Sequence, residues 1–146
     1  MPTVPWKLTF DCADAPAQAA FWIVALGYAE APPPEGWDTW EDWLRHFDVP
    51  EDEWDDGASL VDPDGVLPGV TFLKVPEGKT AKNRLHLDLW VSGGRHRPAE
   101  ERESAIREHV AKLLAAGATV LEEGPEGGPL DHVVMQDPEG NEFCVA

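Results

Sequence analysis

The sequence is short of cysteine, of basic residues and of long apolar runs, and each shortage excludes a class of protein. Its 146 residues include two cysteines, Cys12 and Cys144, which is too few for a disulfide scaffold and favours a cytoplasmic location. Eleven lysines and arginines stand against 28 aspartates and glutamates, so nucleic acids and anionic membranes are poor partners. No apolar run could span a bilayer, and the first five residues lack the pattern of a secretory signal.

The chain does contain two successive patterns of strand, helix and further strands. In the first half, residues 7–12 alternate with period two, which predicts a strand with one apolar face. A helix follows, because Asp14 suits an N-cap position and Gly27 suits a helix end. Two further strands are predicted at residues 58–61 and 69–75.

The second half repeats this order after a polar linker. Residues 83–91 show the clearest alternation in the sequence, which predicts a strand with His86, Asp88 and Trp90 on its polar face. A helix over residues 98–116 and a strand over residues 118–123 follow.

Residues 131–145 close the chain with two predicted strands joined by a tight turn. Pro138 fixes φ for the turn, and Gly140 supplies a backbone conformation that other residues resist. The Asp137 side chain is placed to accept hydrogen bonds from the amides of the same turn.

A segment rich in tryptophan and acidic residues, at about residues 32–57, interrupts the first half. Trp40, Trp43 and Phe47 follow helical spacing, which predicts a short amphipathic helix. The tryptophans form either a small satellite core beneath a loop or an aromatic lid over a planar ligand.

Three stretches together resemble the vicinal oxygen chelate superfamily, which includes glyoxalase I, extradiol dioxygenases and bleomycin-resistance proteins. They are residues 7–28, residues 84–91 and the Asp-Pro-Glu-Gly-Asn corner within residues 137–143. The chain looks most similar to the glyoxalase-like branch. The resemblance implies an α+β fold, in which paired βαβββ modules form a curved mixed sheet around a cavity. It further implies a single glyoxalase-like domain, residues 1–146, with modules at about 5–76 and 83–146.

Metal-using members of the superfamily hold a divalent ion with four side chains, and the resemblance assigns those positions to Lys7, Lys74, His86 and Cys144. Lysine is a poor ligand at neutral pH because its ammonium group has no lone pair. Only His86 clearly keeps a family ligand, so the expectation is that no metal cofactor is bound. If a divalent metal does bind, His86 and Glu142 would hold it, because Glu142 shares a strand face with Cys144.

The predicted catalytic residues are His86, Asp88 and Glu142, which could carry out acid–base chemistry. The alternative for His86 is a structural histidine bonded to Asp88 or to a neighbouring strand. The other predicted cavity residues are polar or aromatic: Lys7, Thr9, Asp11, Lys74, Trp90, His132, Cys144, Trp40 and Trp43.

The leading functional hypothesis is a glyoxalase-like protein that binds a small molecule, either as a metal-independent lyase or isomerase or without catalysis. One alternative is a lyase or dioxygenase that depends on a divalent metal. Another is sequestration of a ligand, as in drug-resistance members. The resemblance also leaves a homodimer open, because modules in this superfamily pair within one chain or between two.

Overall fold

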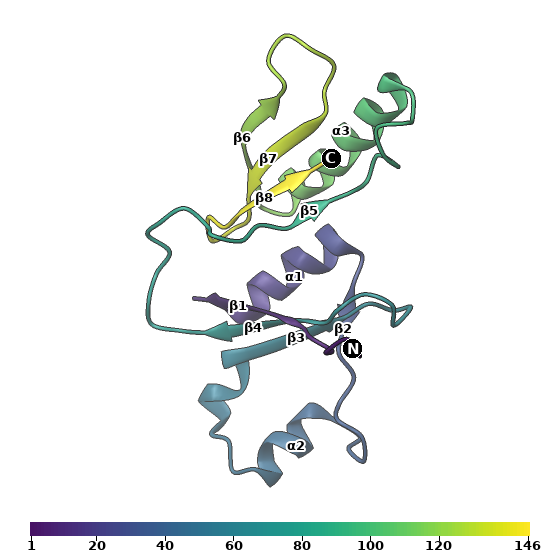
Figure 1. The fold of residues 1–146 in the computed structure, drawn as a ribbon. Helices are drawn as coiled ribbons and strands as arrows, with labels where there is room; N and C mark the ends of the chain where they lie inside the picture. Colours follow the sequence, from purple (N-terminus) through teal and green to yellow (C-terminus); the bar gives the residue numbers. More distant parts are fainter. The chain divides into compact units, whose positions relative to one another are not determined.

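The computed structural model describes residues 1–146, which divide into two compact units (Figure 1). Unit 1 comprises residues 1–23 and 27–78, and unit 2 comprises residues 24–26 and 79–146. None of the helices is both long enough and apolar enough to cross a membrane.

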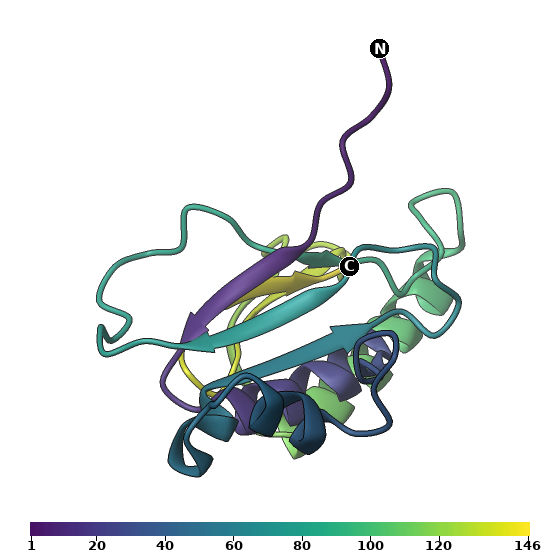
Figure 2. The ribbon, with the colours of Figure 1, turned by 90° about the horizontal axis from the view of Figure 1, so that it is seen from below.

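Unit 1 is built on a four-stranded mixed sheet with the strand order β1-β4-β3-β2. Its first strand, β1, pairs in parallel with β4, and the other pairs are antiparallel. Figure 2 shows β1 beside β4, with residues 1–7 leading away from β1. The elements are β1 (Leu8–Cys12), α1 (Ala15–Leu26), β2 (Ala29–Glu30), α2 (Trp40–His46), the 3-10 helix η1 (Glu51–Asp56), β3 (Gly57–Val61) and β4 (Val70–Lys74).

Local signals explain where α1 begins and ends. The carboxylate of Asp14 accepts a hydrogen bond from the Ala17 amide, and Gly27 ends the helix with a φ of 70°. The helix packs on the sheet through aromatic rings, because Phe10 of β1 lies 5.2 Å from Trp22 and 5.4 Å from Phe72, centroid to centroid.

The predicted amphipathic helix in the Trp-rich insertion is α2, and none of its residues is buried. The aromatic rings contact one another instead: Trp40 lies 5.7 Å from Trp43, which lies 4.9 Å from Phe47. The indole N–H of Trp40 also donates to the carbonyl of Ala31 at 2.9 Å. Through these contacts the rings form a small aromatic cluster within the insertion.

Unit 2 repeats the arrangement of unit 1, with the strand order β5-β8-β7-β6 and a parallel β5–β8 pair. The helix α3 contacts β6, β7 and β8. The elements are β5 (Asp88–Leu89), α3 (Ala99–Ala115), β6 (Thr119–Gly124), β7 (His132–Gln136) and β8 (Glu142–Val145). Two βαβββ modules, each with an open mixed sheet, confirm the predicted α+β fold class.

The strand predicted over residues 83–91 is much shorter in the structure, where only β5 is regular. An alternating pattern sets which way side chains point, but a strand also needs a partner. Here the partner β8 begins only at Glu142, and the last backbone–backbone hydrogen bond toward the N-terminal side joins the Cys144 amide to the Leu87 carbonyl. Leu85, beyond the reach of β8, is 80% exposed.

The Asp137 carboxylate organises the turn between β7 and β8 as the sequence predicts. Its Oδ1 accepts from the amides of Glu139 and Asn141, each at 2.9 Å, and its Oδ2 accepts from the Asn141 side chain at 2.9 Å. Gly140 has a φ of 85°, a conformation that favours glycine. Asp137 is only 3% exposed, so these bonds form largely away from water.

Replacing Asp137 with alanine should lower the free energy of unfolding by about 3 kcal/mol, because the half-buried amides of Glu139 and Asn141 lose a charged acceptor. Urea denaturation followed by circular dichroism measures the change. The matched control is Asp64→Ala, which removes an exposed turn aspartate and should change the free energy by less than about 0.5 kcal/mol. Equal losses in the two variants would contradict the role given to Asp137.

Candidate functional site

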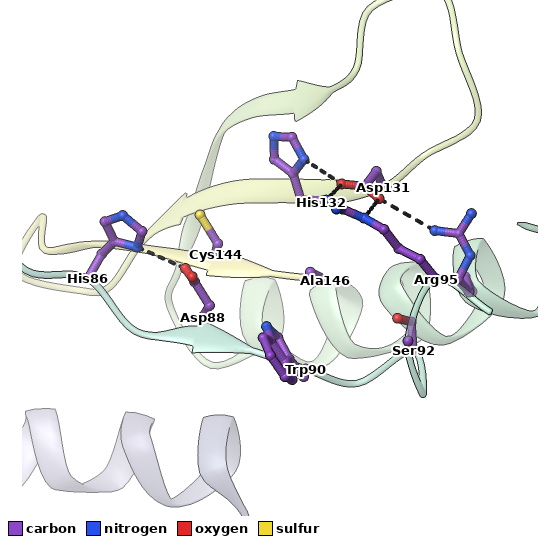
Figure 3. Close-up of a pocket in the computed structure, with 11 residues that line it drawn as sticks. His86, Asp88, Trp90, Ser92, Arg95, Asp131, His132, Cys144 and Ala146 are labelled. Atoms are coloured by element: carbon purple, nitrogen blue, oxygen red, sulfur yellow. Dashed lines mark hydrogen bonds and ion pairs between the residues drawn. The ribbon is translucent and has the colours of Figure 1, made fainter. Parts of the chain in front are cut away.

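Unit 2 contains a pocket of about 540 Å³, a volume suited to a small organic molecule. Its walls come from β5, the segments on either side of β5, α3, β7 and β8. Figure 3 shows two groups of polar side chains along it. His86, Asp88 and Cys144 lie toward one end, whereas Arg95 and Asp131 lie toward the other.

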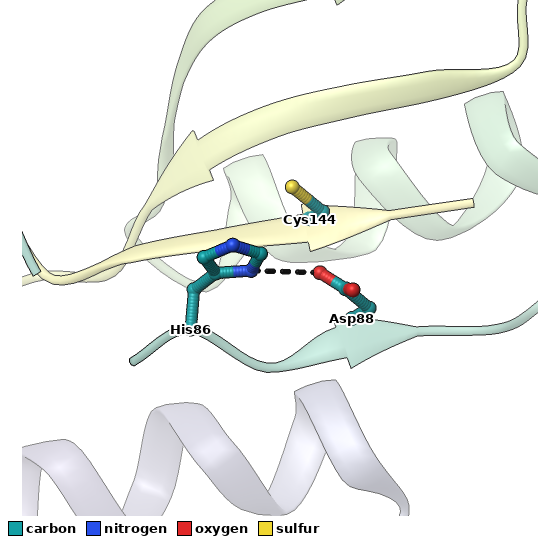
Figure 4. Close-up of side chains that lie close together, drawn as sticks. All are labelled: His86, Asp88 and Cys144. Atoms are coloured by element: carbon teal, nitrogen blue, oxygen red, sulfur yellow. Dashed lines mark hydrogen bonds and ion pairs between the residues drawn. The ribbon is translucent and has the colours of Figure 1, made fainter. Parts of the chain in front are cut away.

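The first group is assembled by the parallel pairing of β5 with β8, which places Asp88 opposite Cys144. His86 precedes Asp88 by two residues and points to the same side (Figure 4). The Nδ1 atom of His86 lies 2.8 Å from Oδ1 of Asp88. One ligand atom from each of His86, Asp88 and Cys144 lies within 4.8 Å of the other two. The group therefore offers a histidine–carboxylate pair beside a thiol.

The Cys144 thiol is held in its neutral form. Burial raises the pKa of the Cys144 thiol, and the negative charge of Asp88 raises it further. A cysteine nucleophile needs the opposite shift, toward the thiolate. The site therefore does not present Cys144 as an activated nucleophile.

The second group is centred on the Asp131 carboxylate. Arg95 donates to it twice, from Nε to Oδ1 at 2.9 Å and from a terminal nitrogen to Oδ2 at 3.0 Å. The Nδ1 atom of His132 lies 3.2 Å from Oδ2, and Nη1 of Arg102 lies 3.5 Å from Oδ1. Hydrogen bonds from Arg95 and His132 lower the pKa of Asp131 to about 2, so this carboxylate is ionised at neutral pH.

Glu142, a predicted catalytic residue, is engaged elsewhere and does not line the pocket. Its Oε2 accepts a hydrogen bond from the Asn83 amide at 3.1 Å and lies 3.2 Å from Nζ of Lys79. Burial alone would raise the pKa of Glu142, but these hydrogen bonds more than offset it and keep the pKa below the usual range. In this structure the carboxylate joins the linker before β5 to the start of β8.

The other predicted site residues fall into two groups. His86, Asp88, Trp90, His132 and Cys144 all line the pocket of unit 2. The rest belong to unit 1, where Thr9 and Asp11 are exposed on β1 and Lys74 lies 3.7 Å from Asp56. The remaining unit 1 residues are Lys7, just before β1, and Trp40 and Trp43 in the aromatic cluster of α2.

Sequence reasoning missed the residues of the second group, chiefly Arg95, Arg102 and Asp131. The signal available in the sequence was the pair Gly93-Gly94, shortly after the alternating segment 83–91. In the structure the φ angles of these two glycines are 80° and 104°. Such conformations favour glycine and mark a sharp change of direction before Arg95. Arg102 gives no local signal, because a basic residue near the start of a helix usually faces solvent.

A family model for the glyoxalase-like domain matches residues 7–146, which is nearly the whole chain. The chain belongs to the glyoxalase-like domain family. This confirms the resemblance drawn from the sequence. No curated protein matches the chain.

Solved structures share the fold of this glyoxalase-like protein at low sequence identity. A glyoxalase/bleomycin resistance protein/dioxygenase family enzyme from Burkholderia phytofirmans is 16% identical over 95% of this chain and 94% of that one, with a TM-score of 0.61. The fosfomycin resistance protein FosX from Mesorhizobium loti is 10% identical over 99% and 92%, with a TM-score of 0.60. FosX from Listeria monocytogenes, in complex with Mn(II) and 1S,2S-dihydroxypropylphosphonic acid, is 12% identical over 99% and 90%, with a TM-score of 0.60.

Asp131 should stabilise the protein in a manner that depends on pH. Its pKa is depressed from 3.8 to about 2, so the stabilisation is fully present above about pH 5 and is lost as pH falls toward 2. Asp131→Asn should lower the free energy of unfolding by about 1 kcal/mol at pH 7, a modest value because Arg95 is 84% exposed. Urea denaturation from pH 7 to pH 3 should show the two proteins converging, and a constant difference would exclude this account.

Proposed function

We propose that this glyoxalase-like protein binds a small organic molecule in the pocket of unit 2 and moves a proton with His86. The observation that carries the proposal is the 2.8 Å contact between Nδ1 of His86 and Asp88 at one end of that pocket. The reaction class is a proton transfer of the lyase or isomerase type.

The contact with Asp88 assigns a role to each nitrogen of the imidazole ring. When Nδ1–H donates to the carboxylate, Nε2 keeps its lone pair and acts as the general base. The carboxylate then stabilises the imidazolium that forms when Nε2 takes a proton. Asp88 thus orients His86 and favours its charged state during the transfer.

Side chains in the walls of the pocket could hold a ligand next to His86 and Asp88. Trp90 lines the pocket and is 85% exposed, so its indole face is available for a ligand to pack against. The neutral thiol of Cys144 borders the same end and adds a weakly polar surface. The site combines an apolar wall, a base and room for a small molecule, as ligand pockets do.

Deuterium exchange in heavy water tests proton transfer without knowledge of the natural substrate. A panel of small neutral ketones, each with a C–H beside the carbonyl, is incubated with the protein and followed by NMR. At least one compound should exchange that hydrogen, and His86→Gln should slow the exchange about 100-fold. Asp88→Asn should slow it as well, because the amide can stabilise the wrong tautomer.

The control for this experiment is His96→Gln, which changes an exposed histidine of unit 2 that does not line the pocket. Its exchange rate should equal that of the unchanged protein. Exchange that continues at full rate in His86→Gln would remove His86 from the mechanism. Binding of a ketone by calorimetry with no exchange would point to sequestration.

A second candidate function, chemistry with a divalent metal, is favoured by the closeness of His86, Asp88 and Cys144. Imidazole nitrogen, carboxylate oxygen and thiolate sulfur are all zinc ligands, and the three side chains together leave a fourth position for a substrate. The donor set thus fits Zn²⁺, whereas the Mn(II) of the Listeria FosX complex prefers oxygen ligands. A bound ion would act as a Lewis acid toward a substrate oxygen. In this arrangement Asp88 either joins the ligands or orients His86.

Titration with Zn²⁺ separates this ligand set from one that uses Glu142. Calorimetry on protein treated with chelator should give stoichiometric binding, and Cys144→Ser should weaken it at least tenfold. Glu142→Gln should leave the affinity within about twofold, because Glu142 lies outside the pocket. Replacing Zn²⁺ with Co²⁺ adds a spectroscopic check, since a thiolate ligand gives a near-ultraviolet absorption band. If calorimetry shows no stoichiometric binding of Zn²⁺, the metal-dependent function is excluded.

A further inference from the structure

The end of the pocket opposite His86 gathers three basic side chains around a single carboxylate. Arg95 comes from the loop after β5, Arg102 from the first turns of α3, and His132 from the start of β7. All three contact Asp131, with nitrogen–oxygen distances of 2.9 Å for Arg95, 3.5 Å for Arg102 and 3.2 Å for His132. Segments from three different parts of unit 2 therefore converge on one carboxylate (Figure 3).

The basic side chains of the pocket gather at the end opposite His86. The guanidinium groups of Arg95 and Arg102 share the single ionised carboxylate of Asp131 there. The other aspartate of the pocket, Asp88, lies at the far end beside His86. Two arginines in one pocket stand out in a chain with 11 lysines and arginines against 28 aspartates and glutamates.

Arg102 has hydrogen-bond donors that the protein does not use. Its side chain is 14% exposed, and its Nε donates to the Arg97 carbonyl at 3.2 Å. The contact from Nη1 to Asp131 is 3.5 Å long, which is an ion pair but no good hydrogen bond. A guanidinium group carries five N–H donors, so the terminal ones remain available to the pocket that Arg102 lines.

The other arginine of α3, Arg107, is satisfied by neighbouring carboxylates. Arg107 donates to Glu103 at 2.9 Å and to Glu123 at 3.3 Å, so it has more carboxylate partners than Arg102. The terminal N–H groups of Arg102 are not sealed from solvent, so they donate to water until a bound anion takes its place. Arginine also binds carboxylate and phosphate with two parallel hydrogen bonds.

We infer that Arg95, Arg102 and His132 form a subsite for the anionic group of the ligand, either a carboxylate or a phosphate. The inference rests on the proposed function and narrows its substrate class to small organic acids or phosphate esters. The anion is held at this end, while the uncharged part of the molecule extends toward His86. Asp131 holds the basic groups in position without neutralising both arginines.

One glycine keeps the His132 side of this subsite open. Gly124 of β6 pairs with His132, and a Cβ at Gly124 would lie 2.5 Å from Cε1 of the imidazole. Any larger residue therefore pushes the ring away from its place beside Asp131. Gly124 acts as a positioning residue, since it determines where His132 lies without touching the ligand.

NMR titration of the side-chain Nε–H signals of the arginines tests the subsite. Sodium phosphate and sodium acetate are each added to the full chain, with sodium chloride at equal ionic strength as the reference. We expect saturable shifts of the Arg95 and Arg102 signals with at least one of the two anions. The anion that binds more tightly identifies the chemical class.

Two variants that each remove one positive charge distinguish binding at the subsite from general electrostatic attraction. Arg102→Gln should weaken anion binding at least tenfold, whereas Arg107→Gln, on the same helix outside this pocket, should weaken it less than twofold. If Arg102→Gln does not fold, Arg95→Gln serves in its place, because Arg95 is 84% exposed. Gly124→Ala keeps all charges and should weaken binding severalfold by displacing His132.

Three results would overturn the inference: shifts that do not saturate, shifts that chloride reproduces, or equal weakening in the Arg102 and Arg107 variants. The anion titration and the deuterium-exchange experiment test the two proposals separately, because the ketones of the exchange panel carry no anionic group. Exchange that depends on His86 without an anion site would remove the subsite alone. An anion site without such exchange would keep the subsite and remove the proton transfer.

Discussion

The parallel pairing between the first and last strands of a unit is the constraint on which the candidate site depends. In unit 2 this pairing sets Asp88 beside Cys144, although nearly the whole unit lies between them in the sequence. A parallel pair requires a long crossover, and here α3, β6 and β7 form it. The same crossover brings Arg102 and Asp131 to the pocket. The strand order that defines the fold therefore also assembles both ends of the site.

The two ends of the pocket use a carboxylate in different ways. Asp88 has one basic partner, His86, and the geometry suits the transfer of a proton at the free ring nitrogen. Asp131 has several basic partners and remains ionised to low pH, so it serves as a fixed counter-charge. A ligand that spans the pocket would meet a histidine at one end and two arginine side chains at the other. Such an arrangement would orient a molecule with one charged end, and orientation is a large part of catalysis.

Much of the fold could be predicted from the sequence because its signals are local. Asp14 and Gly27 mark the ends of α1, and Asp137 with Gly140 marks the closing turn. The length of β5 could not be predicted, because it depends on where β8 begins. The same limit applies to the site. Period two places His86 and Asp88 on one face, but no local pattern shows that Arg102 reaches Asp131 or that Lys79 engages Glu142.

The neutral state of the Cys144 thiol has a consequence for redox chemistry. Oxidants and alkylating reagents attack the thiolate, and both burial and Asp88 keep the thiolate scarce at neutral pH. The other cysteine, Cys12, is 3% exposed in the core of unit 1. Neither thiol is therefore suited to sense peroxide or to be capped reversibly by glutathione. The thiol of the pocket is therefore less prone to oxidation than an ordinary exposed cysteine.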